Sequence, residues 1–336
     1  MGDRQMRMNS TRNQHFLPRI EQKLNAINPG SASDKLRIYS FRIQERELYK
    51  ITLENPRGHL ISSTLSMLDL FSFDVPKGGR IRMNLEELFH KYEANIEVHT
   101  KNLVEKLSKR SSDIKVEVVE LFAAKLLNFI RNPYCIEKVL NSFPLIETCE
   151  PVDQGLLAIY RRILTGRKPH QVHLCKELGI SEETYIRWLR LLFMLLAPLS
   201  SAHPTMFEGV INGLFENRNT QAFVLAWIYD EDCVLLSDRG FCQVLPDGNH
   251  MSMSFNLCST AFIDYIFLDV ETVMKDRVSP EVLDGALNLW RKRPVTTVNV
   301  TVKENDRDAL VRYNRHVIEW SRERVYCATK SGVVLS

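Results

Sequence analysis

The sequence lacks several features that would assign the protein to a well-known class. No apolar run approaches the roughly 20 residues that a membrane-spanning helix needs, because the longest candidate, Trp188 to Leu196, is interrupted by Arg190. The first residues contain no hydrophobic core of a secretory signal. A net charge of +3 is too small to indicate a nucleic-acid or membrane partner by itself. We therefore expect a cytoplasmic protein without a transmembrane segment.

Sequence motifs of common enzymes and metal sites are also missing. The chain has seven cysteines, an odd number, and no two of them are spaced as C-x-x-C. This pattern predicts free thiols in a reducing compartment and argues against a structural zinc site. We find no G-x-S-x-G, no phosphate-loop lysine, no dinucleotide-binding glycine pattern and no H-E-x-x-H. No reaction can be assigned from a single motif.

The order of the expected elements predicts an α+β fold. Apolar residues make up 44% of the 336 residues and charged residues 25%, which is ordinary for a globular protein with an ample core. Residues 1–83 carry an N-terminal arm and strands, residues 84–216 are helical, and residues 217–336 are rich in strands and end in a helix. We expect a central helical bundle flanked by a mixed or antiparallel sheet formed from N-terminal and C-terminal strands.

Hydrophobic periodicity and turn residues give approximate bounds for these elements. The expected helices are Asn84 to about Leu107, Ser112 to Ile130, Gln154 to Leu164, Gln171 to Leu178, Glu182 to Leu196, Pro204 to Phe215, Pro280 to Trp290, and Glu304 to about Glu323. The expected strands are Leu36 to Ile43, Glu47 to Leu53, Gln221 to Tyr229, Cys233 to Leu236, Gly240 to Leu245, Ala261 to Leu268, and Val295 to Val302.

The N-terminal arm contains the most informative short segment, Gln14-His15-Phe16-Leu17-Pro18. Proline fixes its own φ and drives the preceding residue towards extended geometry. The imidazole and the amide therefore lie on a stiff, extended arm that can be laid across a folded body. Such an arm suits a site better than a disordered tail does.

Residues 170–196 resemble a DNA-binding helix-turn-helix. Ser181 can cap the second helix, and Arg187 and Arg190 on that helix are candidate nucleic-acid contacts. The first turn of the helix, however, presents Glu182 and Glu183, which phosphates repel. The alternative interpretation is an ordinary corner between two helices, and the acids favour it.

Three further polar patterns each allow a functional and a structural interpretation. Glu86 and Glu93 are seven residues apart on one helix side, where they can hold a divalent metal, perform acid–base work or simply face water. Asp238 follows an apolar run, a position typical of both sites and turns. Asn314 has apolar neighbours at i+3 and i+4, so its amide is expected to be buried, where it either fastens backbone or orients another site group.

Taken in order, these pieces resemble a bacterial domain-of-unknown-function family with serial 4238. The similar segments are Gln14 to Pro18 followed by the strand from Leu36, the pair Glu86 and Glu93, Leu121 to Pro133, Leu235 to Asp238, and Asn314 to Tyr326. This chain departs from the family pattern where Arg239 and Gly240 replace an asparagine and a proline, where a proline near Phe255 is absent, and where Ser321 replaces an alanine.

The resemblance implies a set of recurring polar positions but no settled activity. Members often look like accessory genes of mobile elements and phage-defence islands. In a metal-assisted hydrolase, the resemblance implies His15, Arg131 and Asn314 as catalytic residues and Glu86, Glu93 and Asp238 as ligands of Mg²⁺ or Mn²⁺. The same residues could instead form a buried polar network that fastens the N-terminal arm.

Two functional hypotheses follow from the sequence. The first is an anti-phage defence or toxin-like effector with a metal-assisted site that hydrolyses phosphodiesters. The second is a non-enzymatic sensor or adaptor that binds a partner protein from the same defence operon, a nucleic acid or a phage component through the helical region. Convergence of His15, Glu93 and Asp238 on an open pocket would favour the enzyme, and enclosed or scattered positions would favour the adaptor.

Overall fold

The computed structural model describes residues 11–75, 82–111, 113–199, 204–231, 233–243, 250–275, 277–292, 298–331 and 333–336. The chain forms two compact units, and each unit is assembled from three separate stretches. Unit 1 consists of Met1–Arg19, Ser63–Asn95 and Leu126–Gly209, and unit 2 of Ile20–Ser62, Ile96–Lys125 and Val210–Ser336. These units cut across the three segments expected from the sequence, because residues 96–125 group with the C-terminal strands.

Helices make up most of unit 1, and α8 (Glu182–Leu196) is its most buried element. The hydroxyl of Tyr185 donates to the Leu70 carbonyl at 2.7 Å, and the indole of Trp188 donates to the Ile130 carbonyl at 2.8 Å. The other helices of this unit are α2 (Glu86–Glu93), α5 (Ile136–Ser142), α6 (Gln154–Thr165) and α7 (Gln171–Leu178).

The N-terminal arm forms a strand in unit 1. Strand β1 (Asn13–His15) pairs antiparallel with β5 (Ser66–Leu68), and β6 (Ser72–Asp74) pairs with β7 (Met83–Asn84). The amide of Gln14 is fully buried, accepts a hydrogen bond from the Phe71 N–H at 2.6 Å and donates to the Ser72 hydroxyl at 3.2 Å. The arm is therefore extended and bound to the body of its unit.

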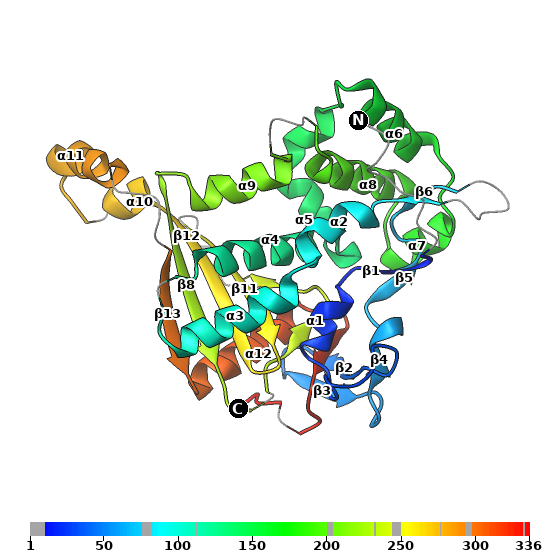
Figure 1. Cartoon of the computed structure of the whole chain (residues 1–336), viewed down its shortest axis with the longest axis horizontal. Helices are drawn as coiled ribbons and strands as arrows, with labels where there is room; N and C mark the ends of the chain where they lie inside the picture. The colour runs from blue at the N-terminus through cyan, green and yellow to red at the C-terminus, as the bar shows by residue number, and fades with distance from the viewer. Residues whose placement is uncertain are drawn as a thin grey trace. The chain divides into compact units, whose positions relative to one another are not determined.

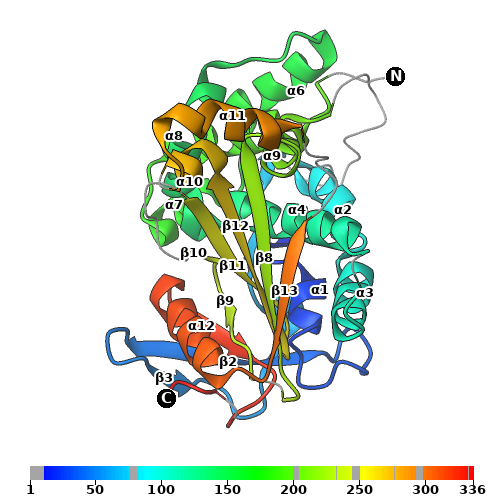
Figure 2. The same ribbon diagram turned by 90° about the vertical axis from the view of Figure 1, so that its left-hand side faces the viewer.

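The larger sheet of unit 2 has the strand order β10-β11-β12-β8-β13. Its strands are β8 (Thr220–Ile228), β10 (Cys242–Gln243), β11 (His250–Cys258), β12 (Ala261–Asp269) and β13 (Asn299–Glu304). All neighbours are antiparallel except β13 and β8, which run parallel. Figure 2 shows β13 at the edge of this sheet.

Helices cover both faces of the larger sheet (Figures 1 and 2). On one face lie α3 (Ile96–Ser108) and α4 (Lys115–Arg131), and the hydroxyl of Tyr265 donates to the Val118 carbonyl at 2.9 Å. On the other face lies α12 (Arg307–Trp320), whose Tyr313 stacks on Phe262 with ring centroids 4.0 Å apart. Because side chains alternate along a strand, Phe262 and Tyr265 of β12 serve opposite faces.

The second sheet of unit 2 joins strands from both ends of the sequence. Its order is β3 (Lys50–Leu53), β2 (Arg37–Glu45), β14 (Arg324–Cys327) and β9 (Leu236–Ser237), with β4 (His59–Leu60) also paired to β2. Buried residues of this sheet and of α12 form one hydrophobic core. The predicted α+β class, with a sheet that combines N-terminal and C-terminal strands, is confirmed.

Some elements differ from the sequence expectation. The single helix expected from Asn84 to Leu107 is two helices, α2 and α3, and the residue pattern did not predict β11. The expected strand Cys233 to Leu236 shares only Leu236 with the two-residue β9, and residues 244–245 and 295–297 of two other expected strands lie outside the described residues. The remaining helices are α1 (Arg19–Lys23), α9 (Met206–Phe215), α10 (Val270–Lys275) and α11 (Pro280–Arg291). Among the helices that the structure describes, none could span a membrane.

Candidate functional site

Three of the predicted site residues come together in unit 1. Arg131, the last residue of α4, lies beside α2 and donates from Nη1 to the Glu93 carboxylate and from Nη2 to the Asn128 side-chain oxygen at 3.0 Å. Its guanidinium also lies 5.1 Å from the centroid of the Phe89 ring, and its side chain is only 2% exposed. We call Glu86, Glu93, Asn128 and Arg131 the Arg131 cluster.

Glu86 is the member of the Arg131 cluster with a clearly raised pKa. The pKa of its carboxyl is raised to about 7, chiefly by burial; the positive charge of Arg131 lowers it, and the nearby charge of Glu93 acts with burial to raise it. The carboxyl of Glu86 therefore changes its charge near neutral pH. Such a group is capable of acid–base work, and it also makes the stability of the unit depend on pH.

The Arg131 cluster does not have the composition of a divalent cation site. Its guanidinium already places a full positive charge against the Glu93 carboxylate. Over the described residues as a whole, no three His, Cys, Asp or Glu side chains are grouped so that they could hold a metal ion. The assignment of Glu86, Glu93 and Asp238 to Mg²⁺ or Mn²⁺ stays a prediction from the sequence.

The other members of the predicted metal centre belong to different units. His15 lies in β1 of unit 1, is partly buried and pairs through its backbone with Ser66. Asp238 belongs to unit 2 and is 3% exposed. Each residue is therefore best understood from its surroundings within its own unit.

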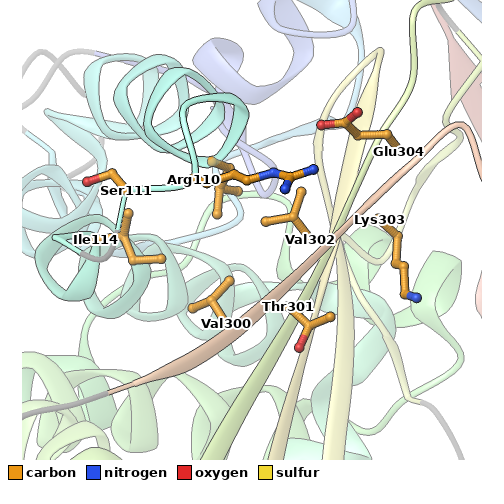
Figure 3. A pocket seen from close by; sticks show the side chains of 9 residues that line it. Arg110, Ser111, Ile114, Val300, Thr301, Val302, Lys303 and Glu304 are labelled. Carbon is orange, nitrogen blue, oxygen red and sulfur yellow. The ribbon is translucent and has the colours of Figure 1, made fainter.

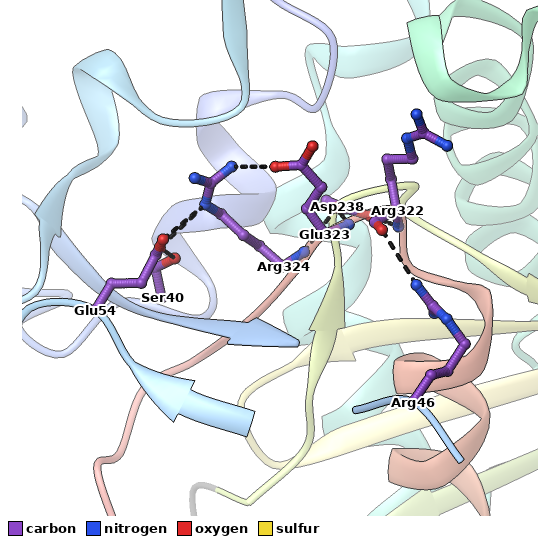
Figure 4. Close-up of polar contacts among 7 residues, drawn as sticks. All are labelled: Ser40, Arg46, Glu54, Asp238, Arg322, Glu323 and Arg324. Carbon is purple, nitrogen blue, oxygen red and sulfur yellow. Dashed lines mark hydrogen bonds and ion pairs between the residues drawn. The ribbon is translucent and has the colours of Figure 1, made fainter. Parts of the chain in front are cut away.

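Asp238 anchors the turn between α12 and β14 (Figure 4). Its two carboxylate oxygens accept the backbone N–H groups of Arg322, Glu323 and Arg324 at 2.6, 2.7 and 2.9 Å. Burial raises the pKa of Asp238, and these three hydrogen bonds act in the opposite direction. On the other side of the turn, the Arg46 guanidinium donates to backbone carbonyls at the end of α12 and just beyond it. The geometry gives Asp238 the role of a turn anchor.

The same turn is joined to the second sheet through an ion pair. Arg324 Nε donates to both carboxylate oxygens of Glu54 at 3.1 and 3.0 Å, and the Ser40 hydroxyl donates to Glu54 at 2.5 Å (Figure 4). Burial acts to raise the pKa of Glu54, but the hydrogen bonds from Ser40 and Arg324 outweigh it, so that the pKa is lowered. These contacts hold the turn between α12 and β14 against Glu54 and Ser40 of the second sheet region, which is a structural role.

Asn314 fastens backbone. Its side-chain oxygen accepts the Leu235 N–H at 3.0 Å, and its side-chain nitrogen donates to the carbonyls of Cys233 and Val334, both at 3.1 Å. The side chain is fully buried on α12. Of the two roles that the sequence left open, the structure places Asn314 in the backbone-fastening one.

The helix-turn-helix-like segment has the expected local geometry, but its arginines are bound internally. Gly179 adopts a left-handed φ of 71° between α7 and α8, and Ser181 caps α8. Arg187 donates to both carboxylate oxygens of Glu147, at 2.6 Å from Nη2, and Arg190 Nε donates to the Tyr160 hydroxyl at 2.9 Å. Contacts of Arg187 and Arg190 with nucleic acid would have to replace these bonds.

A groove that the sequence did not indicate lies beside β13 in unit 2 (Figure 3). It has a volume of about 480 Å³ and is bordered by the edge strand and by the connection between α3 and α4. Val300 and Val302 point towards the connection between α3 and α4, whereas Thr301 and Lys303, which also border the groove, direct their side chains to the other side of the strand. Leu107 and Ile114 complete the apolar part of the wall. We call this hollow the β13 groove.

Charged side chains at the β13 groove have no ion-pair partner within the described part of the chain. Arg110 follows α3 with a left-handed φ of 53°, and its guanidinium is directed towards β13 (Figure 3). Arg110, Lys303 and Glu304 form no ion pair with any residue that the structure describes. These residues belong to no sequence motif, and the only signal in the sequence was the β-branched run Val300 to Val302.

The comparisons with known proteins give no relative. No family model, no curated protein and no solved structure matches the chain. The resemblance to the family with serial 4238 therefore rests on its short motifs and their order alone.

Proposed function

We propose that the protein is a non-enzymatic adaptor that binds an extended segment of a partner protein at the β13 groove. The segment would pair with the outer edge of β13 as an additional strand. One observation carries the proposal: an edge strand runs along a groove of about 480 Å³ whose charged side chains have no described ion-pair partner. The defence context implied by the family resemblance belongs to this proposal as the setting of the adaptor.

The backbone of β13 supports strand addition. Within the described part of the chain, β13 pairs only with β8, from Asn299 opposite Phe223 to Glu304 opposite Ile228. The N–H and C=O groups on the outer side of an edge strand are available to another chain, which is how several peptide-binding domains capture extended segments. The groove beside this edge offers room for the side chains of such a segment.

The predicted hydrolytic residues give less support to an enzyme. Asp238 and Asn314 are occupied by backbone hydrogen bonds, and Arg131 is buried against Glu93. A hydrolytic site needs groups that can reach a substrate and its attacking water. The adaptor hypothesis requires only that these residues stabilise the fold.

The test is selection of randomised peptides by display on the full-length protein. Strand addition predicts that peptides are enriched and that Val302→Asp, which puts a charge into the apolar wall, weakens their binding by about tenfold or more. Val98→Asp on the exposed side of α3 is the matched control and should leave binding unchanged. Circular dichroism of both variants verifies that they fold.

Either of two results would contradict the adaptor. One is that no peptide is enriched on the full chain. The other is that enriched peptides bind the folded Val302→Asp variant as tightly as the parent protein, because their binding surface would then lie elsewhere.

A further inference from the structure

We infer that the segment recognised at the β13 groove alternates apolar and acidic residues. This inference rests on the proposed function and narrows its partner to one chemical class. It follows from the side chains on the two faces of β13 and from the charge at the groove.

The alternation of β13 determines the alternation of a strand paired with it. In neighbouring strands, side chains that lie opposite one another point to the same face of the sheet. On the groove face, residues of an added strand would meet Val300 and Val302 together with Leu107 and Ile114. Apolar side chains fit against these four residues, because a charged group in contact with them would lose water without gaining a polar partner from them.

The opposite face of β13 favours acids. Thr301 and Lys303 are exposed there, so a side chain of the added strand beside Lys303 meets an ammonium group that has no ion-pair partner among the described residues. Opposite charges across neighbouring strands stabilise the pair, whereas like charges destabilise it. A glutamate or aspartate at alternate positions of the segment is therefore preferred to a lysine or arginine.

Arg110 adds to this preference at the wall of the groove. Together with Lys303 it gives two cations against the single anion of Glu304, a net charge of +1 at the groove. The Arg110 guanidinium points towards β13, within the space that the added segment would enter (Figure 3). The acids of such a segment would lie beside Lys303, and the positive charge of Arg110 would add to their attraction and would repel a basic segment.

The experiment compares three short peptides by fluorescence anisotropy with the full-length protein. The first alternates valine and glutamate, the second alternates valine and lysine, and the third repeats the first with alternate backbone nitrogens methylated. We expect the valine–glutamate peptide to bind, the valine–lysine peptide to bind at least about tenfold more weakly, and the methylated peptide not to bind. Added salt should reduce the difference in affinity between the valine–glutamate and the valine–lysine peptides.

A charge reversal locates the preference on β13. Lys303→Glu should reduce the advantage of the valine–glutamate peptide over the valine–lysine peptide, and Lys109→Glu should not, because Lys109 is exposed, pairs with Glu105 and does not line the groove.

The outcomes separate the inference from the proposed function. Equal binding of the two charged peptides, with loss of binding on methylation, would overturn the acidic preference and leave strand addition standing. Binding of none of the peptides, or equal binding of the methylated one, would overturn strand addition itself.

Discussion

The Arg131 cluster and the β13 groove differ in whether their charged side chains are paired among the described residues. In the cluster, a buried guanidinium is bonded to Glu93 and Asn128 and covered by the Phe89 ring. At the groove, and among the residues that the structure describes, the charges of Arg110 and Lys303 have no ion-pair partner and β13 is paired along one edge alone. The first arrangement stabilises the protein internally, and the second can stabilise a complex.

This difference shows what unusual polar residues in a sequence indicate. Residues such as Arg131, Asp238 and Asn314 stood out because a hydrophobic core does not need them, and the structure shows each of them bonded within its own unit. Lys303 and Arg110 did not stand out, since an exposed cation is common on any protein. In our proposal, Arg110 and Lys303 can bind a partner because they lie beside the edge of a sheet.

The largest expected effect concerns the Arg131 cluster. Arg131→Met removes the buried cation and leaves the carboxylates of Glu86 and Glu93 without it, which should lower the free energy of unfolding by about 3 kcal/mol. Urea unfolding measures the change. The matched control is Arg187→Met, which breaks a more exposed pair with Glu147 and should cost under about 1 kcal/mol. Equal losses of unfolding free energy in the two variants would contradict the burial of the Arg131 side chain.

The second prediction uses the pKa of Glu86. The carboxyl has a pKa of about 7 in the folded protein and 4.5 as its ordinary value, so between these values the folded state keeps a proton that the unfolded state has lost. Stability should therefore fall as the pH rises from about 4.5 to about 7 and change little from this group above that range. Urea midpoints measured across this pH range follow the change.

Glu86→Gln should remove only part of this slope. Burial also raises the pKa of Asp264 to about 7, so Asp264 contributes a fall of the same sign. We expect the slope to become shallower in Glu86→Gln and shallower again when Asp264→Asn is added. A slope unchanged by Glu86→Gln would show that this carboxyl ionises normally in the folded protein.

The third prediction concerns the charge of the groove. Arg110→Glu should weaken binding of the valine–glutamate peptide by about threefold, as expected for one exposed charge interaction. Anisotropy titrations at low salt measure the loss. Stronger binding of the valine–glutamate peptide by Arg110→Glu would contradict the proposal that the positive charge of Arg110 attracts acidic segments.

The smallest expected effect is at His15. An adaptor predicts that the full chain degrades no nucleic acid in Mg²⁺ or Mn²⁺, and that His15→Ala changes nothing in that assay. Release of nucleotides that depends on His15 and Glu93 would restore the hydrolase hypothesis and make the Arg131 cluster part of an active site.

Much of the fold could be predicted because local signals agreed with the tertiary structure. Helix α8 begins after the Ser181 cap and buries an apolar face from Tyr185 to Leu196, and α7 and α8 have the expected bounds. Strand β11 was missed because its Met, Ser and Asn residues have little preference for strands. Its pairing with β12, from His250 opposite Leu268 to Cys258 opposite Ala261, provides what local preference does not.

The candidate sites were less predictable for a physical reason. Spacing placed Glu86 and Glu93 on one helix side, but it could not show that Arg131 lies against them from α4. The β13 groove depends on the proximity of residues 300–304 to Leu107, Arg110, Ser111 and Ile114, which are far away in the sequence. No local sequence pattern predicts such a long-range contact, because each of these residue types is common in its own helix, loop or strand.

The most direct test of the account is hydrogen exchange of the full chain with and without the valine–glutamate peptide. Strand addition predicts that the peptide slows exchange of backbone amides in β13, at residues 300–304, while the amides around Arg131 are unaffected. Bound peptide without slower exchange in β13, or with protection centred on α2 and α4, would contradict the claim that this sheet edge is the binding surface.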